Sequence, residues 1–293
     1  MSKWTVGLLA MAAVVAVLCS AVSAPAEDVL KFGVTPREAP MIMFKKFTPM
    51  AQYLSKQLGV KVELVVGKDF QATIDALGKN EVSVALLTPT AYPKCERQYA
   101  DAGIRPIVRF LSDGKGIYKT CVFVPAEGGA ATVAELKGKT FAFGDKTSAA
   151  SHLMPRAMLK EAGIDADKDL TENKFLGSHT NVAQAVAMKQ FAGGGCMDSV
   201  ADRFEKEGKI KIIARSPEMP DTPICVNKHL PSDLCEKIAK ALLALSANDA
   251  EGKNVLTSIN DKYTGCEPAK SEDYNSIREM IQKVYGEDFY KRD

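Results

Sequence analysis

Short apolar runs alternate along this chain with longer stretches whose apolar residues recur at intervals of three and four. Runs of the first kind predict buried strands, and stretches of the second kind predict amphipathic helices. The predicted strands cover 29–34, 60–66, 82–87, 121–124, 140–144, 211–214 and 224–226. The predicted helices cover 47–58, 70–77, 153–159, 182–189, 234–245 and 277–284. This alternation is typical of an α/β protein with parallel sheets flanked by helices.

The chain divides into two sets of such units. A glycine-rich turn at 113–116 follows the first set, and we interpret the composition shift there as a hinge, with 121–124 as a strand that crosses to a second lobe. The proline-rich stretch 217–223 precedes a second crossing at 224–226. We expect the last two helices to pack on the first lobe. The predicted division is 1–26 signal peptide, 27–117 and 225–293 lobe I, and 118–224 lobe II.

The N-terminus has the features of a secretory signal. Lys3 precedes an apolar run at 6–18, and Ala24-Pro25-Ala26 resembles a signal-peptidase site. The run is too short to span a membrane, so export to the periplasm is the prediction. A lipid anchor at Cys19 is disfavoured because Leu18 is bulkier than the small residue that such processing requires.

Charge and cysteine content narrow the function further. The 38 basic and 36 acidic residues leave a net charge of +2, which gives no reason to expect binding to nucleic acid or to an anionic membrane surface. Six cysteines follow the predicted signal, an even number that suggests disulfides in an exported protein, with Cys225 and Cys235 as one close pair. A free thiol at Cys196 is the alternative. No metal-type spacing of Cys and His occurs, so we expect no metal and no cofactor.

Two polar segments lie where a predicted strand leads into a helix. The segment 144–152 contains Ser148, Ser151 and His152, and the segment 177–181 contains His179. A helix start presents unpaired N–H groups and partial positive charge, so two such starts facing one cleft would bind a small anion. Ser148 and Ser151 can equally be helix caps, and His152 can equally be a packed helix residue. His229 is expected on the surface.

Longer stretches carry a family resemblance. The segments 33–36, 47–66 and 88–92 in the first lobe, and 141–163, 177–190 and 216–224 in the second, resemble the periplasmic solute-binding components of phosphonate, phosphite and phosphate ABC importers. These are type II periplasmic binding proteins. The resemblance implies two lobes joined by a two-strand hinge, a small anionic ligand in the interlobe cleft, a permease in the inner membrane as partner, and a monomer that is not an enzyme.

The resemblance also implies a set of ligand-binding residues. Ser148 matches the first serine of the family's Gly-Asp-x-x-Ser-Thr-Ser-Gly run, but Ala149 and Ala150 replace two hydroxyl donors. Phe70 stands where the family has a tyrosine, and the acidic residue of the proline-rich segment is shifted to Asp221. The expected ligand-binding residues are Thr35, Phe70, Thr90, Tyr92, Ser148, Ser151, His152, His179, Asp198, Asp221 and Thr222. These departures leave the identity of the anion open.

Other functions remain as alternatives. The Ser, His and Asp residues include the types needed for nucleophilic chemistry, but no Gly-x-Ser-x-Gly elbow occurs. A periplasmic ligand sensor for a histidine kinase, or a binder of thiophilic oxyanions that uses a cysteine such as Cys196, is the second hypothesis. Arg37 is a further candidate for a positive charge in the first loop, although an arginine there is usually solvated.

Overall fold

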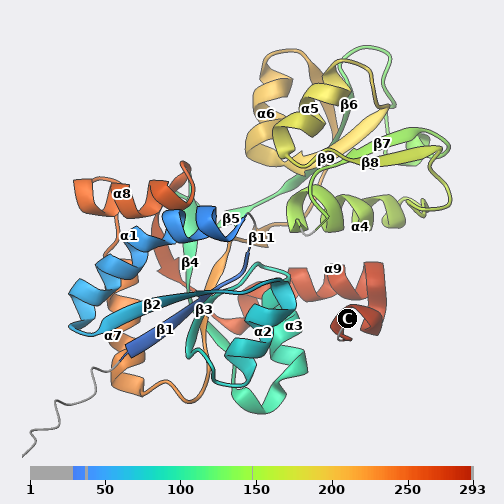
Figure 1. The fold of residues 1–293 in the computed structure, drawn as a ribbon. Helices are drawn as coiled ribbons and strands as arrows, with labels where there is room; N and C mark the ends of the chain where they lie inside the picture. The colour runs from blue at the N-terminus through green and yellow to red at the C-terminus, as the bar shows by residue number, and fades with distance from the viewer. Residues whose placement is uncertain (1–28, 37–38, 147, 292–293) are drawn as a thin grey trace, which may run out of the picture.

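Two mixed sheets, each covered by helices, organise the chain (Figure 1). The computed structural model describes residues 29–36, 39–146 and 148–291. The predicted signal peptide, Cys19 and Arg37 lie outside these described residues. Within the described part of the chain, no helix is both long and apolar enough to cross a membrane. We call the six-stranded sheet with its helices lobe I and the five-stranded sheet with its helices lobe II. The predicted two-lobed α/β fold is confirmed.

Lobe I has the strand order β13-β4-β12-β3-β1-β2. Strand β1 is parallel to β2 and β3, whereas β12 and β13 run antiparallel to their neighbours. The strands are β1 Val29–Val34, β2 Lys61–Val66, β3 Val84–Leu86, β4 Arg105–Ser112, β12 Pro223–Val226 and β13 Tyr263–Pro268. The helices are α1 Pro40–Leu58, α2 Phe70–Gly78, α3 Ala91–Gln98, α7 Ser232–Leu243, α8 Ala250–Ile259 and α9 Asn275–Tyr285.

Lobe II has the strand order β10-β6-β9-β7-β8, in which β7 is parallel to β8 and β9 while β6 is antiparallel to its neighbours. The strands are β6 Thr120–Pro125, β7 Thr140–Phe143, β8 Glu172–Phe175, β9 Gly193–Met197 and β10 Ile210–Arg215. The helices are the π-helical turn η3 Ala149–Leu153, its continuation α4 Met154–Glu161, α5 His179–Ala187 and α6 Asp198–Lys206. Helices α5 and η3 therefore begin close after strands β8 and β7.

The two lobes are joined by a short antiparallel pair, β5 Ile117–Tyr118 and β11 Met219–Pro220. This pair lies between the lobes in Figure 1 and forms the two-strand hinge that the family resemblance implied. The positions predicted for the crossing strands were wrong, however. Segment 121–124 lies within β6 and segment 224–226 within β12, each in the middle of a lobe's sheet. Both are almost fully buried because they are central strands, and that apolar character does not distinguish them from a hinge.

Local signals set most of the predicted elements. Pro40 lies in the first turn of α1, where its missing N–H costs nothing, and Gly59 ends the helix in the left-handed conformation at φ 69°. Sequence analysis did not predict α3, α6, α8, β4, β8 or β13. The last helix also packs differently from the prediction, because α9 contacts α4 of lobe II as well as lobe I, and Lys283 forms an ion pair with Glu161.

The three consecutive glycines of β9 are required by close packing. A Cβ on Gly195 would lie 2.5 Å from Cβ and Cγ of Pro155, and one on Gly194 would lie 2.8 Å from Cγ1 of Val182. Helices α4 and α5 therefore pack against bare backbone. We expect Gly195→Ala to lower the free energy of unfolding by about 1–3 kcal/mol, measured by urea denaturation. Unchanged stability would show that α4 can shift away at no cost.

The structure does not support the predicted disulfides. All six described cysteines are free and buried, and burial raises the pKa of Cys95 and Cys121 to about 12. The proposed partners Cys225 and Cys235 belong to different hydrophobic clusters, one packed with Cys95 under α3 and the other with α1 and α7. Closeness in sequence therefore does not bring these two thiols together. Cys196 is free, as the alternative stated, but it is fully buried.

Candidate functional site

A cavity of about 440 Å³ lies between the lobes, with walls from both of them and from the hinge region. Lobe I contributes Thr88, Pro89, Ser112, Asn260, Lys262 and Tyr263. The hinge region contributes Tyr118, Asp221 and Thr222. Lobe II contributes Asp145, Ser148, Ala149, Ala150, Gly177, His179 and Met197. Four of the eleven residues predicted for the site, Ser148, His179, Asp221 and Thr222, thus share one cavity although up to 74 positions separate them in the sequence.

Ser148 lies at the start of the helix formed by η3 and α4. Its backbone is extended, and its Oγ accepts a hydrogen bond of 3.1 Å from the N–H of Ser151. This is the geometry of an N-cap, which leaves other N–H groups of the first turn for a guest. Ala149 and Ala150, the two departures from the family's hydroxyl pattern, line the cavity beside it. Among the residues of this turn that the structure describes, Ser148 alone therefore brings a side-chain hydroxyl to the cavity.

His179 is the first residue of α5, whose N-cap Ser178 accepts a 3.1 Å hydrogen bond from Asn181 N–H. The backbone N–H of Met197 donates to His179 Nδ1 at 3.1 Å, so the ring proton sits on Nε2. Burial, assisted by the nearby charge of Lys262, lowers the pKa of His179 from 6.5 to about 4. At neutral pH the ring is therefore an uncharged donor rather than an imidazolium.

The hinge side of the cavity carries a buried carboxylate. Asp221 is 5% exposed, and its Oδ2 accepts from Ser112 Oγ at 2.5 Å while its Oδ1 accepts from the Thr222 backbone N–H at 2.6 Å. Tyr274 Oη donates to the Asp221 carbonyl at 2.8 Å, which holds the segment in place. A carboxylate at this position accepts hydrogen bonds and repels a fully ionised anion.

Lys262 is a residue of the cavity that the sequence analysis missed. It lies in the loop between α8 and β13, neither of which was predicted, and its Nζ donates to Ser199 Oγ at 3.0 Å. Ser199 is in α6 of lobe II, so this hydrogen bond crosses from one lobe to the other. The local sequence Asn260-Asp261-Lys262 has the character of an ordinary solvated turn, and no local signal marks the lysine.

Three predicted residues of lobe I do not line this cavity. Thr35 is fully buried and donates to the Leu86 carbonyl at 2.9 Å. Phe70 and Thr90 line a separate, smaller cavity of about 200 Å³, which also touches Lys146. Thr90 nevertheless borders the main site, because its Oγ1 is 3.2 Å from that of Thr88.

Four more predicted residues are engaged elsewhere. Tyr92 is buried, and its hydroxyl forms hydrogen bonds with Glu96 and Ser271, both at 2.9 Å. The remaining three lie near the cavity and hold its walls in place. Ser151 Oγ accepts from Asp145 N–H at 3.3 Å, His152 packs edge-on against Phe143 and Phe175, and Asp198 accepts from Lys119 N–H at 3.1 Å.

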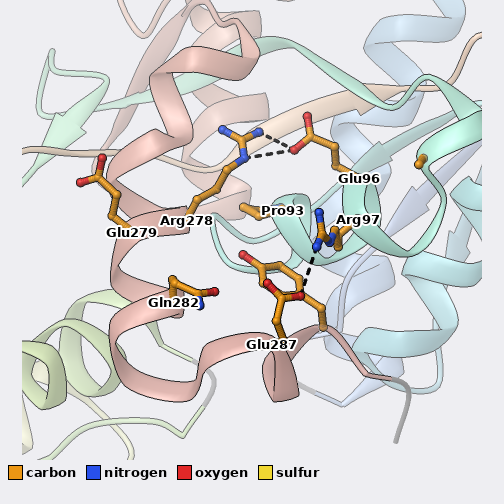
Figure 2. Close-up of a pocket in the computed structure, with 9 residues that line it drawn as sticks. Pro93, Glu96, Arg97, Arg278, Glu279, Gln282 and Glu287 are labelled. Carbon is orange, nitrogen blue, oxygen red and sulfur yellow. Dashed lines mark hydrogen bonds and ion pairs between the residues drawn. The ribbon is translucent and has the colours of Figure 1, made fainter.

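A larger cavity of about 530 Å³ lies between α3 and the C-terminal helix α9 (Figure 2). Its two arginines are paired with carboxylates: Arg278 contacts Glu96 at 2.5 Å, and Arg97 contacts Glu287 at 3.2 Å. Because these cations already have carboxylate partners, the interlobe cavity is the better candidate for an anion site.

The described residues offer little for catalysis. His152 Nδ1 forms a hydrogen bond with the Lys146 carbonyl at 2.7 Å, and His179 Nδ1 accepts one from the Met197 N–H. Among the described residues, neither ring is hydrogen-bonded to a serine hydroxyl. In the part of the chain that the structure covers, no three His, Cys, Asp or Glu side chains are placed to share a metal ion. The prediction that no cofactor is needed stays a prediction.

The chain is similar to periplasmic binding proteins of phosphonate and phosphate transport. The family model described as "ABC transporter, phosphonate, periplasmic substrate-binding protein" matches residues 32–274. The phosphate-import protein PhnD of Mycolicibacterium smegmatis is 23% identical over 275 residues, which cover 86% of this chain and 85% of that protein. The phosphonates-binding periplasmic protein of Escherichia coli is 27% identical over 222 residues, which cover 72% of this chain and 64% of that protein.

A solved structure has the same fold. PhnD1 from Prochlorococcus marinus in complex with methylphosphonate aligns with a TM-score of 0.67 at 21% identity, covering 88% of this chain and 98% of that one. The family model spans both lobes and the hinge, and its range includes every residue that lines the interlobe cavity. The chain therefore belongs to the family of periplasmic substrate-binding proteins of phosphonate ABC transporters.

Proposed function

We propose that this protein binds a small phosphonate-type oxyanion in the interlobe cavity and delivers it, as a monomer and without chemical change, to a permease in the inner membrane. The family supplies the class of function, and M. smegmatis PhnD and P. marinus PhnD1 are described with phosphate and methylphosphonate respectively. Hinge closure on the ligand is the mechanism that two lobes joined by β5 and β11 support.

One observation carries the proposal: donors from two helix starts of lobe II meet hydroxyl groups of lobe I and the hinge at one cavity. Ser148 and His179 mark the two helix starts, and Thr88 and Thr222 lie on the other side. N–H groups and positive dipole ends favour an anion at each start. A ligand held by all of them draws the lobes together, because no single lobe provides the whole set.

The cavity favours an anion that keeps one proton or carries an amine. Asp221 accepts hydrogen bonds but donates none when ionised, so a ligand O–H or N–H facing it is stabilised and a bare oxyanion is repelled. Ala149 and Ala150 remove two donors that the family pattern offers. Each lost hydrogen bond to a charged oxygen costs about 1.5–3 kcal/mol, which disfavours the most highly charged ligands.

The test is a thermal-shift panel on purified mature protein with methylphosphonate, phosphite, phosphate and methanesulfonate, and with arginine as a cationic comparison. An anion at a hundred times its dissociation constant should add about 2.7 kcal/mol to the stability, which corresponds to a rise in Tm of about 5–10 °C for a chain of this size. A shift with arginine and with none of the anions would contradict the proposal.

The cysteine-based alternative gains no support from the geometry. Cys196 is fully buried in lobe II, its pKa is raised by burial, and it does not line the cavity. A thiophilic oxyanion would need a thiolate within reach of the cleft. Delivery to a permease rather than to a sensor kinase is proposed because the matching family is that of transporter components.

A further inference from the structure

The charges around the interlobe cavity are unequally distributed. Its described lining contains the carboxylates of Asp145 and Asp221, and among the residues that the structure describes there, Lys262 alone carries a full positive charge. His179 does not add a second one, since its ring is neutral at pH 7. An anion that enters the cavity therefore meets one cationic side chain, and that side chain comes from lobe I.

Lys262 is positioned close to the donors of lobe II. Its side chain is half-buried, and its Nζ contacts Ser199 Oγ at 3.0 Å, one residue after the start of α6. Its charge also lowers the pKa of His179, which places the ammonium group electrostatically near the start of α5. The lysine thus reaches across the cleft to the side where the helix starts converge.

The hydrogen bond from Lys262 to Ser199 is weaker than the one that an anionic ligand would accept. A neutral hydroxyl accepts a charge-assisted hydrogen bond, but an anionic oxygen accepts one that is about twice as strong. An ammonium group on a four-carbon stem can move by a few ångströms without any change in the backbone. A negatively charged guest in the cavity therefore competes with Ser199 for Lys262 and has the advantage.

We propose that Lys262 is the counter-charge of the bound anion, released from Ser199 when the ligand enters, and that it ties lobe I to a ligand held by the helix starts of lobe II. This inference rests on the proposed function and extends it to a residue that sets both affinity and preference for charge. Binding then transfers one cross-cleft contact from a protein hydroxyl to the ligand, so closure of the lobes depends on the anion itself.

A purely structural role for the same contact makes a different prediction. If Lys262 only tethers the two lobes through Ser199, then removing either partner has the same effect. If Lys262 binds the ligand, the two substitutions have different effects on affinity, because Ser199→Ala removes the competing acceptor and leaves the lysine free for the anion. The pair of variants therefore distinguishes the two roles.

The experiment is isothermal titration calorimetry of the mature protein with methylphosphonate at pH 7.5 and low salt. We expect Lys262→Met to weaken binding at least thirtyfold, Lys262→Arg to weaken it less than fivefold, and Ser199→Ala to leave it unchanged or tighter. Lys253→Met is the matched control. Lys253 is exposed on the neighbouring helix α8, so this substitution removes the same charge outside the cavity. It should bind as the unsubstituted protein does.

A second arm uses methanesulfonate, which carries a single negative charge, in the same titrations. Lys262→Met should lose affinity for methanesulfonate by a similar factor, since the singly protonated methylphosphonate that the cavity favours carries the same single negative charge. Thermal melts of each ligand-free variant confirm folding, and Lys262→Gln replaces Lys262→Met if the latter fails to melt cooperatively.

Two results overturn the inference, and they are distinguishable. If the unsubstituted protein binds methylphosphonate and the Lys262→Met or Lys262→Gln variant binds it equally well, or if Ser199→Ala weakens binding as much as they do, the role of Lys262 is wrong and the proposed function stands. If the unsubstituted protein binds none of the anions in the panel, both proposals fall together.

Discussion

His179→Ala should weaken the binding of methylphosphonate by about tenfold to a hundredfold. The substitution removes the Nε2 donor from the cavity, and a hydrogen bond to a charged oxygen is worth about 1.5–3 kcal/mol. The dipole and backbone N–H groups at the start of α5 remain, so binding is reduced rather than abolished. Calorimetric titration of the variant and of the unsubstituted protein measures the difference directly.

The matched control for this prediction is His229→Ala. His229 is exposed in the loop before α7 and does not line the interlobe cavity, so its removal should leave affinity unchanged. The backbone N–H of Met197 loses its acceptor in His179→Ala, and a melt of the ligand-free variant at pH 7.5 separates that loss of stability from the loss of binding. Equal affinity in His179→Ala and the unsubstituted protein would remove His179 from the ligand site.

The protein should lose stability in mild acid through His179, by up to about 3 kcal/mol. The folded state holds the pKa of this ring near 4, against 6.5 for an unperturbed histidine, so between those two pH values the unfolded chain takes up a proton that the folded chain does not. The stability contributed by the neutral ring is therefore complete above pH 6.5 and is lost as the pH falls towards 4. Burial of the ring is the main cause.

His179→Gln should remove this part of the acid sensitivity. Urea denaturation at pH 7.5 and pH 4.5 gives the free energy of unfolding of each protein, and the drop between the two pH values should be smaller in the variant by about 2–3 kcal/mol. Burial also lowers the pKa of His152, which contributes in the same direction to both proteins and cancels in the comparison. Equal drops in the two proteins would show that His179 is not held neutral.

Much of the fold could be predicted because its signals are local. The strand 29–34 matches β1 at both ends, and the helix predicted to stop at Gly59 does stop there. Strand β9 depends on packing rather than on local preference, because it is built mainly of glycines that packing against α4 and α5 requires, and glycine has little strand preference of its own. Helix α8 and strand β13 were missed because they follow polar segments with weak periodicity.

The candidate site could be predicted only in part. Ser148 and Ser178 are N-caps, and a cap depends on residues within a few positions, so both helix starts were visible in the sequence. Asp221 and Thr222 entered through family resemblance rather than through any local pattern. Lys262 was not found, because a lysine in a polar turn has the same local appearance whether it faces solvent or a cavity.

The sequence by itself determined the alternation of strands and helices, the two capped helix starts and the family to which the chain belongs. These depend on periodicity, on short capping motifs and on motifs spread over most of the chain. Only the tertiary structure decided which donors share a cavity, that the six thiols are buried apart from the cleft, and that Lys262 reaches across it. Those features depend on contacts between residues tens of positions apart. The burial that keeps His179 uncharged is likewise a property of the whole folded structure rather than of any one segment.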